Sequence, residues 1–283
     1  MQIHWKNPRF LVGFLCAMLV GGCSTVSVTS KQFIPRDTGK PALLKKTAPS
    51  HQVENIEFTH AGGAVSRGLS VHKPDAAFTV LYFMGSGLRV DVNGAAMARP
   101  FIDMNANFIA FDYHDFGRSD APDAPFGLHD LEDETLALYD QVRATTHGKL
   151  VVHGHSFGSF VAARLASRRK LDALVLEGTG TSAQAYADNM IPWFAKPFVR
   201  VKLDAELVAI DNRVALGTFH GPVLVINGVN DVQTPIATSR ALFDGLGNPQ
   251  KRFEAVKDAG HMNAMSKPGT LIAYRAFIDG HYQ

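Results

Sequence analysis

The chain has 283 residues, 46% of them apolar and 19% charged, which suits one large globular domain or two small ones. This composition excludes collagen, coiled coil and wholesale disorder. Its 28 lysines and arginines nearly balance 26 aspartates and glutamates, so we expect no nucleic-acid partner. No apolar run approaches the roughly 20 residues that cross a bilayer, which excludes a polytopic membrane protein.

Residues 1–22 have the layout of a secretory signal peptide. Lys6 and Arg9 precede a short apolar run at 10–20, and two glycines stand directly before Cys23. The sequence Val-Gly-Gly-Cys resembles the lipobox of bacterial lipoproteins, in which the cysteine becomes the first residue and is acylated. We therefore predict a cleaved signal peptide and a lipid anchor, with palmitate as a candidate acyl group, at Cys23. An ordinary or uncleaved signal is the alternative.

Cleavage after residue 22 would remove Cys16 and leave Cys23 as the one cysteine, so an intramolecular disulfide is excluded. Residues 23–50, rich in Ser, Thr, Pro and Lys, are interpreted as the lipidated cysteine and a flexible tether. By resemblance to Gram-negative lipoproteins, Ser24 favours passage to the outer membrane. We expect an exported, membrane-anchored lipoprotein whose leaflet and oligomeric state stay open.

From residue 51 onward, strands and helices alternate. An antiparallel pair is expected first, at 53–59 and 65–71. Short, continuously apolar stretches then indicate strands buried on both faces of a parallel sheet, at 78–84, 107–112, 149–152, 171–176 and 223–226, with a last strand at 251–256. Helices are expected at 92–105, 131–146, 157–168, 235–245 and 270–278. This order predicts a three-layer α/β/α sandwich over 51–283 with a mostly parallel eight-stranded sheet and a small helical cap at about 179–221.

The segment Gly-His-Ser-Phe-Gly at 154–158 lies where a predicted strand turns into a predicted helix. It has the G-x-S-x-G form of a nucleophile elbow, in which small residues permit a strained turn that raises the serine oxygen above the sheet. We therefore predict Ser156 as a nucleophile. The alternative is a glycine-rich turn with an idle serine.

A serine hydroxyl needs a base to take its proton, and the base must be held by an acid. Asp231 and His261 each follow a predicted strand and come after Ser156 in the order Ser, Asp, His, so they are the predicted partners. Glu177, at the end of another strand, is the alternative acid. His153 and His155 beside the elbow are interpreted as packing or supporting groups.

Acyl transfer also needs hydrogen-bond donors for the oxyanion. The first expected donor is the backbone N–H of Phe157, directly after the nucleophile. The second is expected in the glycine-rich loop at 84–87, from Ser86 or, as second choice, Gly87. No pair of histidine and cysteine, or of carboxylates, has metal-ligand spacing, so we expect no metal site, and no cofactor is implied.

These motifs make the chain resemble the α/β-hydrolase superfamily from about residue 53 to 278. The segment at 111–119 is similar to the Tyr-Asp-Tyr-Arg-Gly-x-Gly-x-Ser segment of its small-capped Bem-type and ABHD-type branch, which includes lysophospholipid lipases and protein depalmitoylases. Residues 191–194, 228–231 and 260–261 also fall where that branch has similar residues. Met84 replaces the usual histidine of the oxyanion loop, and His114 and Asp115 replace Arg-Gly.

The resemblance and the triad together predict a serine hydrolase that cleaves carboxylic esters or thioesters, with acyl or lipid-like substrates favoured. The cap carries apolar side chains that could cradle an acyl chain or, as we expect, pack the cap onto the sheet: Tyr186, Met190, Ile191, Trp193, Phe194 and Phe198. A non-catalytic lipoprotein binding module and a serine peptidase are the alternatives.

Overall fold

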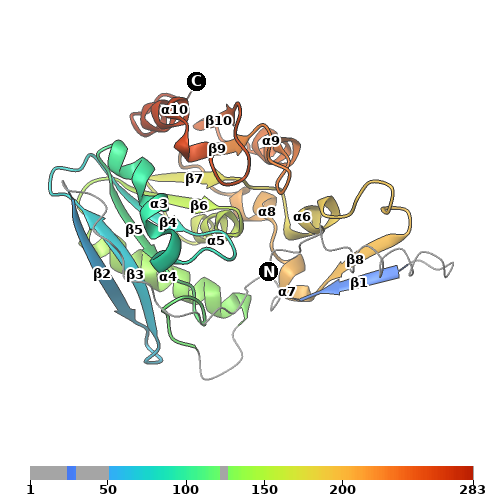
Figure 1. Ribbon diagram of the computed structural model, residues 1–283, viewed down its shortest axis with the longest axis horizontal. Coiled ribbons are helices and arrows are strands. Elements are labelled where there is room, and N and C mark those ends of the chain that lie inside the picture. Colours follow the sequence, from blue (N-terminus) through green and yellow to red (C-terminus); the bar gives the residue numbers. More distant parts are fainter. Residues whose placement is uncertain (1–23, 30–50, 122–126, 283) are drawn as a thin grey trace.

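The computed structural model describes residues 24–29, 51–121 and 127–282 (Figure 1). The predicted signal peptide at 1–22, the predicted acylation site Cys23 and most of the predicted tether lie outside the described residues. Within the described part of the chain, no helix has both the length and the apolar character needed to cross a membrane.

An eight-stranded sheet forms the centre of the main body, with helices on both faces (Figure 1). Its order is β10-β9-β7-β6-β4-β5-β3-β2. The pairs β2–β3 and β3–β5 are antiparallel and the other neighbours are parallel. The strands are β2 (Gln52–Thr59), β3 (Val65–His72), β4 (Thr79–Phe83), β5 (Asn107–Phe111), β6 (Leu150–His155), β7 (Ala173–Glu177), β9 (Val223–Gly228) and β10 (Lys251–Val256). The predicted three-layer sandwich with a mostly parallel sheet is confirmed.

The central strands β4, β6, β7 and β9 are buried along their whole length, as continuous apolar runs predict. Strand β6 was expected to end at residue 152, but it continues to His155. The buried His153 ring explains the difference: it lies among aromatic rings of the core, 4.9 Å from Tyr82 and 5.7 Å from Tyr274 between ring centroids. A polar residue that interrupts the apolar pattern is therefore part of the core.

Five longer helices flank the sheet: α3 (Val90–Asp103), α4 (Leu128–Thr145), α5 (Phe157–Ala166), α9 (Ile236–Gly245) and α10 (Pro268–Ile278). Helices α3 and α10 share one face, where the rings of Phe101 and Tyr274 are 5.9 Å apart. Helices α4 and α5 pack against each other and are tied by the ion pair between Arg164 and Glu132. This arrangement leaves the carboxyl ends of the parallel strands to carry the loops in which ligands of such sheets bind.

Between β7 and β9 the cap contains α6 (Ala183–Asn189), β8 (Val199–Leu203), α7 (Ala205–Val208) and α8 (Asn212–Leu216). A short 3-10 helix, η1 (Ala264–Ser266), follows β10, outside the cap. The cap thus holds a strand as well as helices. Strand β1 (Ser24–Val28) pairs with β8 in parallel, from Ser24 opposite Val199 to Val28 opposite Leu203. The expectation of a tether without regular structure is wrong at these residues, because alternating Ser, Thr and Val suits a strand once β8 offers an edge.

The cap aromatics do not all pack onto the sheet, and this expectation is also wrong. Trp193 is 83% exposed, Phe194 54%, Phe198 55% and Met190 37%. Tyr186 is only partly exposed, and burial, followed by the charge of Asp231, raises its pKa. The cap therefore turns Tyr186 toward the triad region and leaves its largest aromatic side chains in solvent.

Candidate active site

Ser156 lies between the last residue of β6 and the first residue of α5. Its backbone has φ 53° and ψ −118°, a strained conformation that residues other than glycine rarely adopt. A Cβ atom at Gly154 would collide with the carbonyl of Gly158, and one at Gly158 would collide with the carbonyl of Phe83. The two glycines are thus required by the close approach of strand and helix, and the turn they permit has the backbone of a nucleophile elbow.

Asp231 and His261 meet at the carboxyl ends of β9 and β10. The Nδ1 atom of His261 lies 2.8 Å from Oδ2 of Asp231, and both side chains are buried. The other carboxylate oxygen of Asp231 accepts the backbone N–H groups of Gln233 and Thr234, each at 2.9 Å. The carboxylate is therefore fixed in the orientation that an acid supporting a histidine needs.

Asp231 is held in its charged form. Burial raises its pKa, but hydrogen bonds from His261 and from the backbone and hydroxyl of Thr234 outweigh burial and keep the pKa below the ordinary value. The Thr234 hydroxyl donates to Oδ2 at 2.7 Å and lies 3.2 Å from Nδ1 of His261. An ionised Asp231 favours the His261 tautomer that carries its proton on Nδ1 and leaves Nε2 as a base.

Glu177, the alternative acid, is bonded to a different histidine. Its Oε2 lies 3.2 Å from Nε2 of His153, and both side chains are buried. Burial raises the pKa of Glu177, but the His153 bond and nearby histidines outweigh it and keep the pKa below the ordinary value. Glu177 thus supports the core below the site, whereas Asp231 is the carboxylate bonded to His261.

His155 has a contact that the sequence did not reveal. Its Nε2 lies 2.9 Å from the backbone carbonyl of His261. Because burial lowers the pKa of His155, the ring is neutral near pH 7 and must carry its proton on Nε2 to donate this bond. His155 therefore fixes the backbone of the loop that carries His261.

Ser156 and His261 both lie close to residues 177–178. The N–H of Ser156 donates to the carbonyl of Glu177 at 2.8 Å, and a Cβ atom at Gly178 would lie 3.1 Å from Cε1 of His261. The hydrogen bonds among described residues do not include one from Ser156 Oγ to His261 Nε2. Such bonds are often long before substrate binds and shorten in the reacting complex.

The expected oxyanion loop lies directly against the elbow. A Cβ atom at Gly85 would come within 3.2 Å of Ser156 Cβ and 2.9 Å of His155 Nδ1. Ser86 and Gly87 follow it and are exposed, and Gly87 has φ +82°. Phe157, the other predicted donor, is the first residue of α5. The loop and the start of α5 thus both adjoin the serine, and their roles as donors stay predictions.

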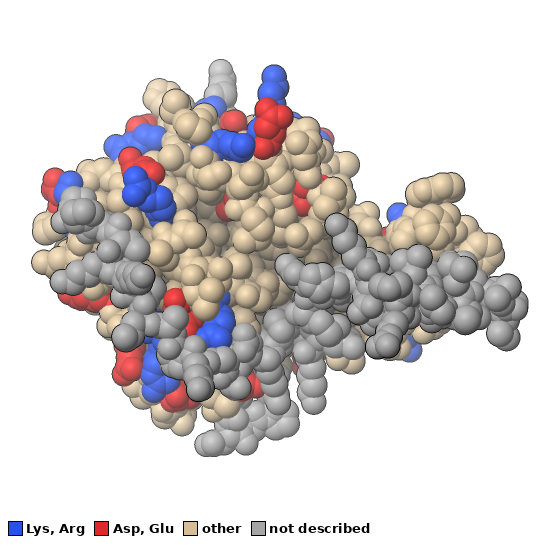
Figure 2. Space-filling view, in the orientation of Figure 1, with Lys and Arg blue, Asp and Glu red and all other residues tan. Residues whose placement is uncertain are grey.

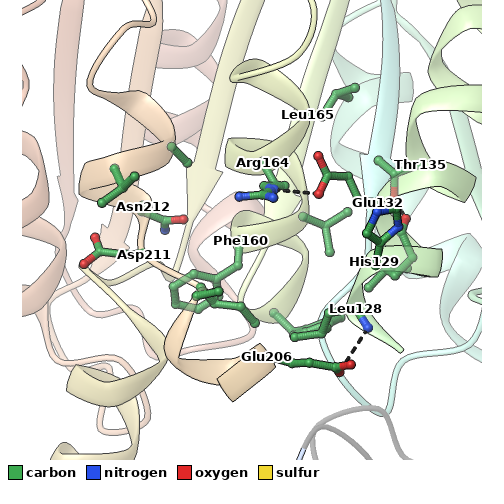
Figure 3. Close-up of a pocket in the computed structure, with 17 residues that line it drawn as sticks. Leu128, His129, Glu132, Thr135, Phe160, Arg164, Leu165, Glu206, Asp211 and Asn212 are labelled. Carbon is green, nitrogen blue, oxygen red and sulfur yellow. Dashed lines mark hydrogen bonds and ion pairs between the residues drawn. The ribbon is translucent and has the colours of Figure 1, made fainter. Parts of the chain in front are cut away.

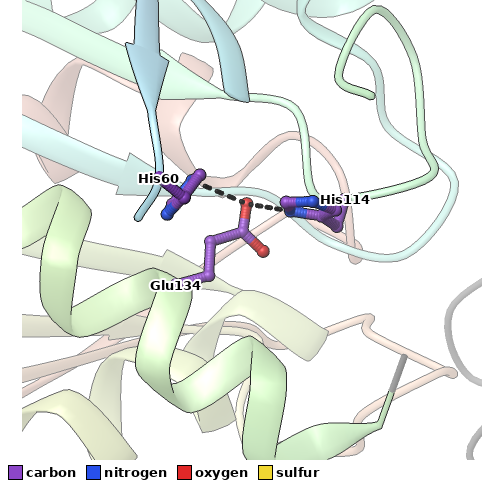
Figure 4. A group of neighbouring side chains, drawn as sticks. All are labelled: His60, His114 and Glu134. Atoms are coloured by element: carbon purple, nitrogen blue, oxygen red, sulfur yellow. Dashed lines mark ion pairs between the residues drawn. The ribbon is translucent and has the colours of Figure 1, made fainter. Parts of the chain in front are cut away.

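A group of metal-ligating residues occurs elsewhere in the described chain. Ligand atoms of His60, His114 and Glu134 lie within 4.8 Å of one another (Figure 4). The Ser66 hydroxyl already connects this group: it donates to Glu134 Oε1 at 2.7 Å and lies 2.8 Å from His60 Nε2. A metal ion would have to displace that hydroxyl, so we interpret the group as a buried polar network. Its members come from β3, α4 and two loops, which is why sequence spacing did not indicate it.

An apolar cavity of about 220 Å³ lies between α4 and α5 on one side and the cap on the other (Figure 3). Its lining includes Phe157, Phe160, Val161 and Leu165 of α5, but not Ser156, Asp231 or His261. Across the cavity are Leu128 of α4 and Ile210 of the cap. Charged residues at its borders form ion pairs or hydrogen bonds, such as Arg164 with Glu132, which leaves the interior largely apolar.

Comparisons with known proteins agree with this architecture. A family model described as alpha/beta hydrolase fold matches residues 95–206. Protein bem46 of Schizosaccharomyces pombe is 24% identical over 213 residues, which covers 74% of this chain and 70% of bem46. The uncharacterized protein YfhR of Salmonella typhi is 26% identical over 234 residues, and 76% of each chain is covered.

Among solved structures, the esterase Pf2001 of Pyrococcus furiosus has a TM-score of 0.65 at 17% identity and covers 84% of this chain and 95% of its own. The chain described here has the α/β-hydrolase fold. A Rhodococcus 2-hydroxy-6-oxo-6-phenylhexa-2,4-dienoate hydrolase shares this hydrolase fold, with a TM-score of 0.59 at 18% identity, 81% of this chain and 99% of the other being covered. The family model and the bem46 and ABHD-like relatives support the α/β-hydrolase superfamily predicted above.

Proposed function

We propose that the protein is a serine hydrolase that cleaves carboxylic esters or thioesters through Ser156, His261 and Asp231. Two observations carry the proposal: the 2.8 Å bond between a buried Asp231 and His261, and the strained backbone of Ser156 at the end of β6. A merely structural serine does not need positive φ and two obligatory glycines around it. Strain at this position is what a nucleophile elbow requires.

In the proposed reaction, Ser156 Oγ attacks the acyl carbonyl while Nε2 of His261 takes its proton. Asp231, kept ionised, stabilises the imidazolium that forms. His261 then gives the proton to the leaving alcohol or thiol, and an acyl-enzyme on Ser156 remains. Water attacks this ester with His261 again as base, and the acid is released as the Ser156 hydroxyl is restored.

The apolar cavity supports an acyl substrate. The triad residues are not among its lining residues, but Phe157 directly follows Ser156 in the chain, and we propose that an acyl chain bound at Ser156 passes Phe157 and extends along α5 into the cavity. An apolar lining recognises hydrocarbon and offers little to a charged or sugar-like group. We therefore propose esters or thioesters of aliphatic acids in preference to peptides, and we propose that the chain meets them at a membrane to which a lipid on Cys23 attaches it.

Hydrolysis of a series of p-nitrophenyl esters by the purified full chain tests the proposal. Ser156→Ala and His261→Ala should each retain less than about a tenth of the wild-type rate, and the residual activity should come from the oxyanion site. Glu177→Gln should retain far more than Asp231→Asn, because only the second change alters the partner of His261. Wild-type rates in Ser156→Ala and His261→Ala would contradict the triad, and a wild type that hydrolyses no ester above the uncatalysed rate would make the protein a binding module. Preference for amides over matched esters would make it a peptidase.

A further inference from the structure

The cap presents an apolar and basic surface that the hydrolytic mechanism does not use. The cap surface, as we call it, consists of four apolar side chains, Met190, Trp193, Phe194 and Phe198, and three cations, Lys196, Arg200 and Lys202. All seven are exposed. The lobe that carries β8 projects from the main body, and the described residues on its upper part in Figure 2 are mostly ones other than Lys, Arg, Asp and Glu.

Two aromatic side chains of this surface are exposed and in contact with each other. Trp193 is 83% exposed, and its ring meets that of Phe194 edge to face with centroids 6.0 Å apart. Phe198 follows four residues later and is 55% exposed. Scattered exposed apolar residues are normal, but adjacent aromatic side chains in solvent mark a surface that binds something.

The charges indicate what it binds. Residues 190–203 contain three cations and no acid, whereas the chain as a whole is nearly balanced. Arg200 and Lys202 lie on the exposed side of β8, whereas Val199 and Leu203 are buried. Tryptophan prefers the headgroup level of a bilayer, and lysine and arginine are attracted to anionic headgroups. The combination fits an anionic lipid surface better than a protein partner, whose interface would be depleted in lysine.

The pairing of β1 with β8 connects this surface to the predicted lipid anchor. Ser24 pairs with Val199, directly after Phe198. Cys23 is bonded to Ser24, so acyl chains on it would be attached within one residue of the strand that borders the cap surface. An anchor placed there brings the cap surface to the bilayer at almost no further cost in chain entropy.

We propose that the cap surface is a membrane-docking surface, with Trp193, Phe194 and Phe198 inserted at the headgroup level of an anionic bilayer beside the lipid on Cys23. This proposal rests on the anchor in the proposed function. Docking would fix the orientation of the cap relative to the bilayer, whereas an anchor at the end of a flexible tether would leave the hydrolase domain free to rotate. It also explains why β1 is paired with the cap and not with the main sheet.

Fluorescence of Trp193 tests the docking directly. The chain has two tryptophans, Trp5 and Trp193, so a Trp5→Phe background makes Trp193 the one reporter whether or not the signal peptide is removed. The full chain is purified from membranes and reconstituted into phosphatidylglycerol–phosphatidylethanolamine vesicles, with or without bromine on the acyl chains. We expect brominated lipid to quench Trp193 by at least about half, as insertion to the acyl boundary requires.

Variants distinguish insertion from simple proximity. Phe194→Ser combined with Phe198→Ser should lower the quenching, and Lys196→Gln, Arg200→Gln and Lys202→Gln together should make it insensitive to the share of phosphatidylglycerol. Ile272→Ser, which removes an apolar side chain that is 72% exposed outside the cap, is the matched control and should change nothing. Unquenched Trp193 in anchored protein, or quenching unaffected by the phenylalanine changes, would overturn the docking proposal.

Two further readouts separate this proposal from the proposed function. Hydrolysis of a water-soluble ester in detergent should be unchanged in the docking variants, since none of these residues belongs to the triad. Intact-protein mass determines whether Cys23 is acylated. Quenching of Trp193 with an unmodified Cys23 would support the cap surface and contradict the anchor. Quenching in a wild-type chain that hydrolyses no ester would contradict the proposed hydrolase and leave the docking proposal intact.

Discussion

His155 donates a hydrogen bond from Nε2 to the backbone carbonyl of His261, at 2.9 Å, and so connects the elbow to the loop of the proposed base. The two residues are 106 positions apart in the sequence. The ring of His155 also contacts the region of Gly85, with Nδ1 2.9 Å from where a Cβ atom of that glycine would be. One buried imidazole thus touches both loops that border Ser156.

We predict that His155 positions His261 and takes no proton itself. His155→Leu keeps the approximate volume but loses the donor, and kcat should fall about tenfold to a hundredfold while KM changes little. His155→Gln retains an N–H donor and should recover most of the rate. Steady-state kinetics on one ester measure both. Equal kcat in the Leu and Gln variants would show that the bond has no positioning role.

Gly158 is predicted to be irreplaceable for packing reasons. A Cβ atom there would overlap the Phe83 carbonyl, so Gly158→Ala must push α5 away from β4. We expect a loss of about 3 kcal/mol in unfolding free energy, measured by urea denaturation. Gly245→Ala, at the end of α9, is the control: nothing lies within 4 Å of its Cβ position, and the variant should equal or slightly exceed wild type. Equal stability of both variants would contradict the close approach.

We predict that Asp112, in the loop after β5, makes the unfolding free energy depend on pH. Burial raises the pKa of Asp112 from 3.8 to about 6, even though its carboxylate accepts the N–H groups of Val90 and Arg118. Because the folded pKa exceeds the unfolded one, the folded protein binds more protons between these values. The unfolding free energy therefore falls as pH rises from about 4 to 6, and the difference between 3.8 and about 6 corresponds to about 3 kcal/mol.

Urea denaturation of wild type and Asp112→Asn from pH 4 to 7 measures this contribution. The difference in unfolding free energy between them should shift toward the variant as pH rises through this window. A pH-independent difference for Asp112→Asn would mean that Asp112 is charged throughout.

The cavity along α5 is predicted to set the acyl length. Val161 is 7% exposed and lines it, so Val161→Phe should fill part of the space. We expect kcat/KM for the longest accepted acyl ester to fall at least about tenfold, with acetyl ester unaffected, because each lost methylene contact costs about 1–3 kcal/mol. Val232→Phe, at a valine that is 88% exposed, is the control. An identical chain-length profile in Val161→Phe would place the acyl chain elsewhere.

The sheet could be predicted closely because its strands are apolar over their whole length and are separated by glycine and helical patterns. The last strand at 251–256 and the start of α5 at Phe157 fall at the predicted positions. Periodicity could not show that β1 pairs with β8, since the partners are 175 positions apart and each is short. It also could not show that Trp193 is exposed, because an aromatic in an apolar cluster is usually buried.

The sequence indicated the candidate site residues but not the hydrogen bonds that hold them in place. The strand-turn-helix setting indicated Ser156 as the candidate nucleophile, and the loop positions indicated Asp231 and His261 as its candidate partners. The bonds from Thr234 to Asp231 and from His155 to His261 depend on loops that meet only after folding. Likewise, the network of His60, Ser66 and Glu134 joins residues that share no local pattern.

The account depends on Ser156 being activated as a nucleophile, and covalent labelling tests this most directly. The full chain is treated with a fluorophosphonate, and intact and peptide masses are measured for wild type, Ser156→Ala and Asp231→Asn. We predict one adduct per chain on the peptide that contains Ser156, no adduct in Ser156→Ala and much slower labelling in Asp231→Asn. An unlabelled wild type, or an adduct that persists in Ser156→Ala, would contradict the account.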